Sequence, residues 1–464
     1  MNLELLKKYY HYLAIFIIGI ILRFYYSSLE SYWIDEQIAF YVSDPNLTFS
    51  EAWLRSHNSD YSPFLFNFFL KIIFTLFSYS PDVGRHLSIL SGILSILFMA
   101  YISFMISKRR SLFMALFLSS FNIFLITYSA ETRAYSTIFL LSSINICLFF
   151  KIFILKKNNK TIESLFFFFS LLSLLSHPFT TLILVSELVF IFIDDFKNKK
   201  IKYSNYFIFA FIFFSYLIIE YKYLILASNY NPPEFFIKNP SLDFFINFYF
   251  SHFFGSKTMG VIYLSIFIFL LIKNKNKIIT NKFYLFLFIL FILTYLTPII
   301  YGHVFNPVLK DRYIIFVLIP IILLISNLIY ELKEKRLRKF LVILVFFSTI
   351  TNQIFELHNH SHNKPDFKNI VKKLNKEEVK NIAIITMDKV HPYMMDIQKK
   401  DPFRERDIIK NYVKNFDNLD KKFLFYNQEK LPQGLKNLWM LCYETIVAGK
   451  CEENIRISKE FKIQ

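Results

Sequence analysis

The sequence is poor in the residues on which secreted scaffolds, fibres and soluble domains depend. Its 464 residues include only 8 glycines, 14 prolines and 3 cysteines, and charged residues make up 19% of the chain. Three cysteines exclude a disulfide scaffold, and so few glycines and prolines exclude fibrous and disordered chains. A soluble domain would carry about 25% charged residues, so this composition indicates a membrane-embedded protein.

Apolar residues take the place of the missing charge. The chain is 55% hydrophobic and 20% aromatic, its mean hydropathy is +0.39, and its 59 phenylalanines cannot all fit one soluble core. Apolar runs of about 17–25 residues mark helices that cross a membrane. We predict eleven such spans, at 9–27, 85–107, 111–129, 134–155, 162–177, 179–195, 203–226, 259–272, 282–300, 313–330 and 340–356.

Acidic residues are also scarce, with 35 Asp and Glu against 53 Lys and Arg. In a soluble protein the formal net charge of +18 would suggest a nucleic-acid partner, whereas in a membrane protein Lys and Arg mark cytoplasmic loops. If the apolar segment 63–79 does not cross, one set of loops holds 21 basic residues and the opposite set before residue 357 holds 8. We therefore predict a cytoplasmic N-terminus, a helix at 63–79 on the outer surface, and no nucleic-acid partner.

The two ends of the chain differ in character. The first span has a basic start and no small-residue cleavage site, which predicts a retained anchor in the cell membrane. After residue 356 the chain becomes polar, so we divide it into a membrane domain, 1–356, and an extracytoplasmic α/β domain, 357–464. In the second we expect a helix at 365–375 and strands near 381–387, 421–427 and 437–443. Cys442 and Cys451 either form a disulfide or are free thiols, and Cys147 packs within a span.

Unusual polar clusters converge on the predicted outer face. They are Trp33–Glu36, Ser59–Pro63, Arg85, Glu131–Tyr135, Ser176–Pro178 and Lys310–Tyr313. Each alone has a structural explanation: Arg and Tyr anchor helices at membrane boundaries, His177 can end a helix, and Asp35 and Glu36 can cap one. Together they suit one chemistry, because a carboxylate acts as general base while Arg, Lys and Tyr hold a phosphate. The combination indicates transfer from a lipid-phosphate donor.

At these residues the sequence resembles the GT-C membrane glycosyltransferases that use polyprenyl-phosphate sugars, which include protein O-mannosyltransferases and the aminoarabinose transferases of lipid A. The resemblance covers about residues 10–375 in order, through Trp33-x-Asp35-Glu36, Ser62–Leu65, Arg85 before Gly92, Glu131–Tyr135, His177, and Asp311–Tyr313 with Pro320. It implies a GT-C-like fold, an outer-facing cavity and an inverting transfer.

The resemblance also implies roles for individual residues. Asp35 would be the base, with Glu36 assisting, and Arg133 and Arg312 would contact the donor phosphate. The remaining substrate-binding candidates are Tyr135, His177, Tyr313, Arg85 and Tyr61. The family's His-Pro-Pro-Leu stretch reads Tyr61-Ser62-Pro63-Phe64-Leu65 here, so Lys310 or Lys71 would have to supply any missing cation.

Other assignments stay open at this point. His358, His360 and His362 alternate in a polar linker, a pattern more typical of solvated residues than of a divalent-metal site, so we assign no metal or cofactor. Asp194 and Asp195 fall at the predicted cytoplasmic side and are interpreted as structural. The alternatives to an enzyme are a transporter or flippase of lipid-linked sugars and a non-catalytic scaffold. Peripheral charges and the absence of a sequence repeat favour the enzyme. The sugar and the acceptor, whether protein, lipid or glycan, are not specified.

Overall fold

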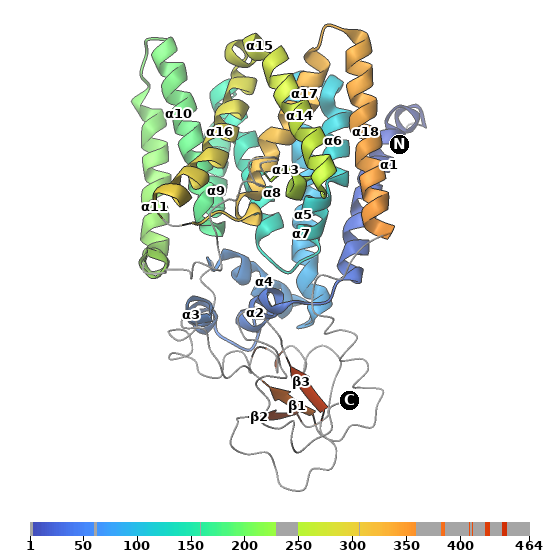
Figure 1. Ribbon diagram of the computed structural model, residues 1–464. Coiled ribbons are helices and arrows are strands. Elements are labelled where there is room, and N and C mark those ends of the chain that lie inside the picture. The colour runs from blue at the N-terminus through green and yellow to red at the C-terminus, as the bar shows by residue number, and fades with distance from the viewer. Residues whose placement is uncertain are drawn as a thin grey trace. The chain divides into compact units, whose positions relative to one another are not determined.

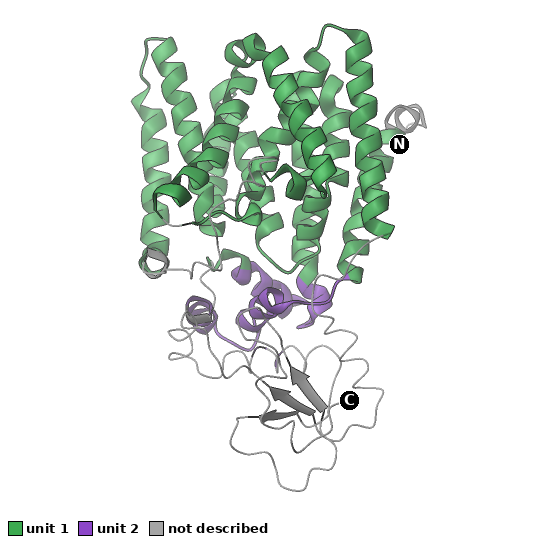
Figure 2. Cartoon of the chain, in the orientation of Figure 1, with its two compact units in different colours: residues 1–29, 63–66, 85–361 green, residues 30–62, 67–84, 362–464 purple. Residues whose placement is uncertain are grey.

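The structure, a computed structural model (Figure 1), describes residues 3–59, 63–157, 159–228, 249–305 and 307–358, three short strands, and residues 408 and 411. The chain forms two compact units, coloured separately in Figure 2. Unit 1 comprises residues 1–29, 63–66 and 85–361, and unit 2 comprises residues 30–62, 67–84 and 362–464. The predicted division at residue 357 stays a prediction.

The described part of unit 1 is helical. Its elements are α1 (Leu3–Leu29), α5 (Pro81–Ser107, from residue 85), α6 (Arg109–Phe121), α7 (Ile123–Ser129), α8 (Tyr135–Phe149), η1 (Phe150–Ile154), α9 (Lys160–Ser176), η2 (Pro178–Thr180), α10 (Thr181–Lys197), α11 (Tyr203–Ser228), α13 (Phe250–Phe253), α14 (Lys257–Lys273), α15 (Lys275–Thr280), α16 (Lys282–Val304), η3 (Asp311–Val317), α17 (Leu318–Glu331) and α18 (Lys335–His358).

A helix lies at each of the predicted spans. Among the described residues, seven helices are long and apolar enough to cross a membrane, and α6 with α7 makes an eighth if the pair is one span. The helices α9, α10 and α14 have 17 residues each, near the lower limit for crossing. The protein is therefore a multi-pass membrane protein, while the number eleven stays a prediction.

The predicted span 111–129 is not one straight helix, because α6 and α7 meet at Asn122 with a bend of 52°. The Asn122 side chain caps α7 by accepting a hydrogen bond from the Leu125 N–H (2.9 Å) and donates to the Phe253 carbonyl (2.8 Å). Arg23, fully buried in α1, donates to the carbonyls of Ser119 (3.0 Å) and Ser120 (3.3 Å) at the end of α6. A cation at a helix C-terminus satisfies carbonyls that lack intrahelical partners, so Arg23 stabilises the break.

Burial separates central helices from peripheral ones. Every residue of α8 is buried, as is every residue of α17 from Leu318 to Ile329. On α11, by contrast, Phe207, Phe211 and Ile218 are 72%, 63% and 74% exposed. Large apolar side chains exposed in a row along a helix suit contact with lipid, which accounts for part of the phenylalanine excess.

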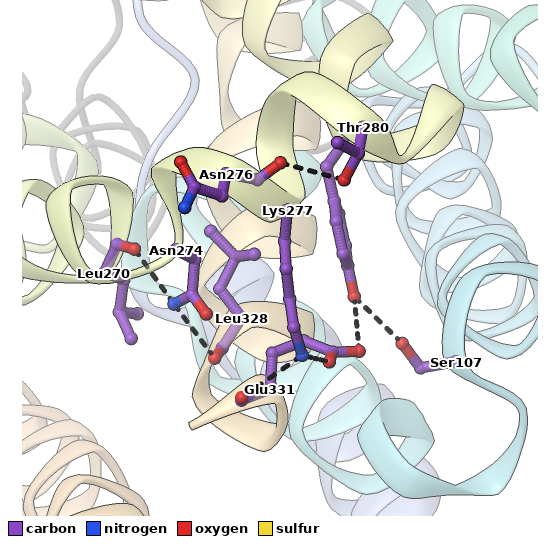
Figure 3. A network of polar contacts seen from close by, with 9 residues as sticks. Ser107, Leu270, Asn274, Asn276, Lys277, Thr280, Leu328 and Glu331 are labelled. Atoms are coloured by element: carbon purple, nitrogen blue, oxygen red, sulfur yellow. Dashed lines mark hydrogen bonds and ion pairs between the residues drawn. The ribbon is translucent and has the colours of Figure 1, made fainter. Parts of the chain in front are cut away.

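The lysine-rich connections of unit 1 share one end of the bundle (Figure 1). Lys277 on α15 pairs with Glu331 at the end of α17, and Lys282 at the start of α16 pairs with Asp194 near the end of α10 (2.5 Å). Tyr284 donates to Glu331 (3.1 Å) and lies 3.3 Å from the Ser107 hydroxyl at the end of α5 (Figure 3). The charge pattern predicted this grouping, while the side of the membrane that this end faces stays a prediction.

Unit 2 contains short helices and a small sheet. They are α2 (Ile34–Val42), α3 (Phe49–Ser59), α4 (Leu65–Leu76, from residue 67), β1 (Ile382–Ile385), β2 (Phe423–Tyr426) and β3 (Trp439–Cys442). With 12 residues, α4 is about 18 Å long and cannot cross about 30 Å of hydrocarbon, as predicted for segment 63–79. The buried Lys71 on α4 donates to the Asp44 carbonyl (2.7 Å).

The three predicted strands of the C-terminal region are confirmed. They form a parallel sheet in the order β2-β1-β3, in which Ile382 is opposite Phe423 on one side and Trp439 on the other. Parallel neighbours need long crossover connections, which is typical of an α/β arrangement. The predicted helix 365–375 and Cys451 lie outside the described residues, so the domain and its disulfide stay predictions.

Candidate functional site

Two of the predicted arginines lie together in unit 1. The guanidinium carbon of Arg312 is 5.7 Å from the centre of the Tyr135 ring, and that of Arg133 is 6.0 Å from the same centre. These distances fall at the usual limit of about 6 Å for a cation–π contact. Two arginines from segments far apart in sequence therefore lie beside the same aromatic ring. That ring belongs to Tyr135, the first residue of α8.

The backbone holds Arg133 in a turn between α7 and α8. Its N–H donates to the Glu131 carbonyl (2.8 Å), and the Ser88 hydroxyl on α5 donates to the Arg133 carbonyl (3.1 Å). Glu131 itself is 4% exposed. Because α5 supports the turn directly, the position of Arg133 is tied to the packing of the bundle.

Arg312 begins the η3–α17 run, one of the most buried stretches of the protein. The Asp311 carboxylate accepts a hydrogen bond from the Arg312 N–H (2.7 Å) at the start of η3. The Arg312 guanidinium carbon lies 5.8 Å from the centre of the Tyr313 ring. Arg133 thus lies just before the fully buried α8, and Arg312 lies near the start of the η3–α17 run, each with a tyrosine beside it.

His177 belongs to the same cluster and also ends a helix, so both interpretations of this residue hold. It lies in the turn between α9 and α10, its Nδ1 accepts a hydrogen bond from the Phe179 N–H (3.2 Å), and its ring centre is 5.3 Å from that of Tyr313. Burial lowers the pKa of His177 to about 4, and the charge of Arg133 acts in the same direction. At neutral pH the ring is therefore uncharged, with its proton on Nε2.

A second histidine in unit 1 was not singled out by sequence analysis. Nδ1 of His252, on α13, lies 2.6 Å from a carboxylate oxygen of Asp311. The hydrogen bond with Asp311 raises the pKa of His252 and outweighs the opposing effect of burial. The one available signal was a lone titratable residue within an aromatic stretch, Phe250–Phe254, which does not identify a partner.

The two predicted catalytic carboxylates are in unit 2, at the start of α2. Glu36 is fully buried, and its side chain accepts a hydrogen bond from the Trp33 N–H (3.3 Å) at the start of the helix. Glu36 therefore has the capping role that the sequence allowed for it. Asp35 is half-buried, which makes it the more accessible carboxylate of the two.

The remaining predicted residues have other positions. Arg85 is 4% exposed, and its guanidinium donates to the Ser27 carbonyl near the end of α1, so it joins α1 to α5. Tyr61 lies outside the described residues, as do His360 and His362. Within the described ranges, no group of three or more His, Cys, Asp or Glu side chains is placed to hold a metal ion.

No protein-family model matches the chain, and no curated protein sequence matches it. Among solved structures, the chain is similar to ArnT from Cupriavidus metallidurans in the apo state, with 12% identity over 87% of this chain and 74% of that chain and a TM-score of 0.49. The same enzyme bound to undecaprenyl phosphate gives 10% identity over 87% and 76%, with a TM-score of 0.45. The Archaeoglobus fulgidus oligosaccharyltransferase in complex with Zn and sulfate gives 12% identity over 83% and 61%, with a TM-score of 0.49.

Proposed function

We propose that the protein is a glycosyltransferase that moves one sugar, with inversion, from a polyprenyl-phosphate donor to an acceptor at the outer face of the cytoplasmic membrane. The observation that carries this proposal is the meeting of Arg133 and Arg312 at the Tyr135 ring. The planar guanidinium group of arginine can donate two parallel hydrogen bonds to phosphate oxygens. An aromatic ring beside it leaves its positive charge intact. A phosphate borne by a membrane lipid is the anion that such a helix bundle would meet.

The proposed reaction is a single displacement at the anomeric carbon. An acceptor hydroxyl or amine attacks this carbon and gives its proton to Asp35, while the bond from the carbon to the phosphate oxygen breaks. The phosphate takes the electron pair and gains a negative charge, which Arg133 and Arg312 stabilise. Tyr135, Tyr313 and the neutral His177 would line the donor pocket, and Glu36 would fix the start of the helix that carries Asp35.

A transporter of lipid-linked sugars is the second candidate, and one observation favours it. Glu187 is fully buried within α10 and accepts a hydrogen bond from Asn145 on α8 (3.2 Å), and Asn145 in turn accepts one from Ser170 on α9 (2.8 Å). Ionisable residues inside membrane spans often mark transport pathways. A transporter should depend on Glu187, whereas the proposed transferase should depend on Asp35.

The transferase and the transporter can be distinguished by complementing a strain that lacks this chain. We expect its glycan profile, read by mass spectrometry, to lose one sugar mass, which the wild-type chain and Glu187→Gln restore. Asp35→Asn should not restore it, although the purified variant still binds polyprenyl phosphate. Restoration by Asp35→Asn would remove Asp35 as the base, and failure of Glu187→Gln alone would favour transport.

A further inference from the structure

The displacement described above uses neither His252 nor Asp311, although the two side chains are in contact. The two residues are 59 positions apart in sequence, and they bring α13 against the start of η3. One oxygen of Asp311 meets Nδ1 of His252 (2.6 Å), and the other accepts the N–H of Arg312 (2.7 Å). A single carboxylate therefore fixes both the imidazole ring and the backbone that carries Arg312.

This arrangement orients the ring. Because Nδ1 is engaged by the carboxylate, Nε2 on the opposite edge is the nitrogen that can meet a ligand. The His252 side chain is 56% exposed, whereas Asp311 is 20% exposed. The pair thus has a buried anchor and an accessible imidazole edge.

The segment is held by a second contact. The Tyr249 hydroxyl, also at α13, donates to the Leu309 carbonyl (3.4 Å), and the Tyr249 and His252 ring centres are 5.4 Å apart. Two contacts between α13 and residues 309–311 fix the ring relative to Arg312. Through Asp311, His252 is therefore linked to the backbone that carries Arg312.

We propose that His252, oriented by Asp311, binds the phosphate of the lipid donor through Nε2 as a third cationic group beside Arg133 and Arg312. This inference rests on the proposed function. When the bond between sugar and phosphate breaks, the leaving phosphate takes the electron pair and its charge rises from about −1 to about −2. A third donor placed at that oxygen stabilises the added charge.

The proton stays on His252 during this step. The second ionisation of a phosphate monoester has a pKa of about 6. Asp311 raises the pKa of His252 above its ordinary value of 6.5, so the ring holds its proton more tightly than the phosphate does. His252 therefore acts as a charged hydrogen-bond donor, and the acceptor's proton alone moves, to Asp35.

The groups that border the pair determine its pH dependence. Among the described residues they are Tyr249 just before α13, Arg312 on η3 and Tyr128 on α7. Arg312 keeps its charge at all relevant pH values, and burial raises the pKa of Tyr249 to about 12. Because Asp311 raises the pKa of His252, the ring loses its charge as pH rises through that pKa, and the affinity for phosphate should fall with it.

The test measures binding of undecaprenyl phosphate to the full chain in nanodiscs, together with sugar transfer. His252→Gln keeps a hydrogen-bond donor without the charge and should weaken binding about 10- to 100-fold at pH 7. His252→Arg should bind within about threefold of the wild type, and its affinity should no longer decline as pH rises. The matched control is His303→Gln, at the exposed end of α16, which should behave like the wild type in both assays.

Each outcome bears on one proposal. Unchanged binding and an unchanged pH profile in His252→Gln, with a wild type that binds and transfers, would overturn the role of His252 alone. A wild type that neither binds the lipid nor transfers a sugar would overturn the proposed function and this inference with it. An equal loss of phosphatidylglycerol binding in His252→Gln would assign the residue to general lipid headgroups instead of the donor.

Discussion

The two ends of unit 1 use positive charge in different ways. At the lysine-rich end, Lys277 (Figure 3) and Lys282 each pair with a carboxylate from another helix. At the opposite end, Arg133 and Arg312 lie beside the Tyr135 ring, and the η3–α17 run of about 30 Å separates them from Glu331. The arginine end also holds a carboxylate, Asp311, beside Arg312, but there two guanidinium groups share one aromatic ring.

The difference suggests that one end holds helices together and the other is built to meet an anion. Tyr284 and Ser107 extend the Lys277–Glu331 pair into a network across α5, α15, α16 and α17. Such a network stabilises the ends of helices and offers little to a ligand. The arginine cluster instead places charge just before the fully buried α8 and near the start of the η3–α17 run, where packing restricts its movement.

Loss of an arginine should have the largest effect on the protein. Arg312→Ala is expected to lower kcat/KM for sugar transfer about 100- to 1,000-fold, because it removes a donor that stabilises charge on the leaving phosphate. Arg312→Lys keeps the positive charge but loses the planar guanidinium group, so its kcat/KM should lie between those of Arg312→Ala and the wild type. Transfer assays at saturating acceptor would measure both. A loss below about threefold in Arg312→Ala would break the contrast between the two ends.

Replacement of His177 should have an intermediate effect, and it should appear in the thermal stability of the protein rather than in sugar transfer. Its pKa of about 4 in the folded protein lies below the ordinary value of 6.5, so the unfolded chain binds a proton more readily between these values. The contribution of neutral His177 to the free energy of unfolding is therefore complete above about pH 6.5, and it is lost as pH falls toward 4. Thermal unfolding from pH 7 to 4 should show a smaller decline for His177→Asn than for the wild type. Equal declines would mean that the ring is not kept neutral by its surroundings.

Apolar runs and basic loops made much of this fold predictable. A helix, or for 111–129 a bent pair of helices, lies at each predicted apolar run, since a hydrocarbon core demands spans of about that length whatever the neighbours are. Arg133 and Arg312 could be chosen because cations are rare among the predicted outer loops. Segment 63–79 was set apart by Lys71, and α4 is indeed too short to cross.

Contacts between distant residues were beyond sequence reasoning. At the bend, Asn122 donates to the Phe253 carbonyl, 131 positions away. Arg85 joins two helices by donating to the Ser27 carbonyl, 58 positions away. The sequence marks Asp311 only as a neighbour of Arg312, because nothing in one sequence indicates that His252 lies against it. Periodicity determines which residues form helices, but it does not specify which side chains meet when the helices pack.

The smallest effect is expected at the lysine-rich end. Glu331→Gln removes the charge that pairs with Lys277 and keeps an oxygen that can accept from Tyr284. Because Lys277 is 45% exposed, water screens the pair, and the loss should be at most about 1 kcal/mol of the free energy of unfolding. We expect the melting temperature in nanodiscs to fall by about 2–4 °C or less, with transfer unchanged. A loss of transfer as large as that of Arg312→Ala would show that both ends take part in the reaction.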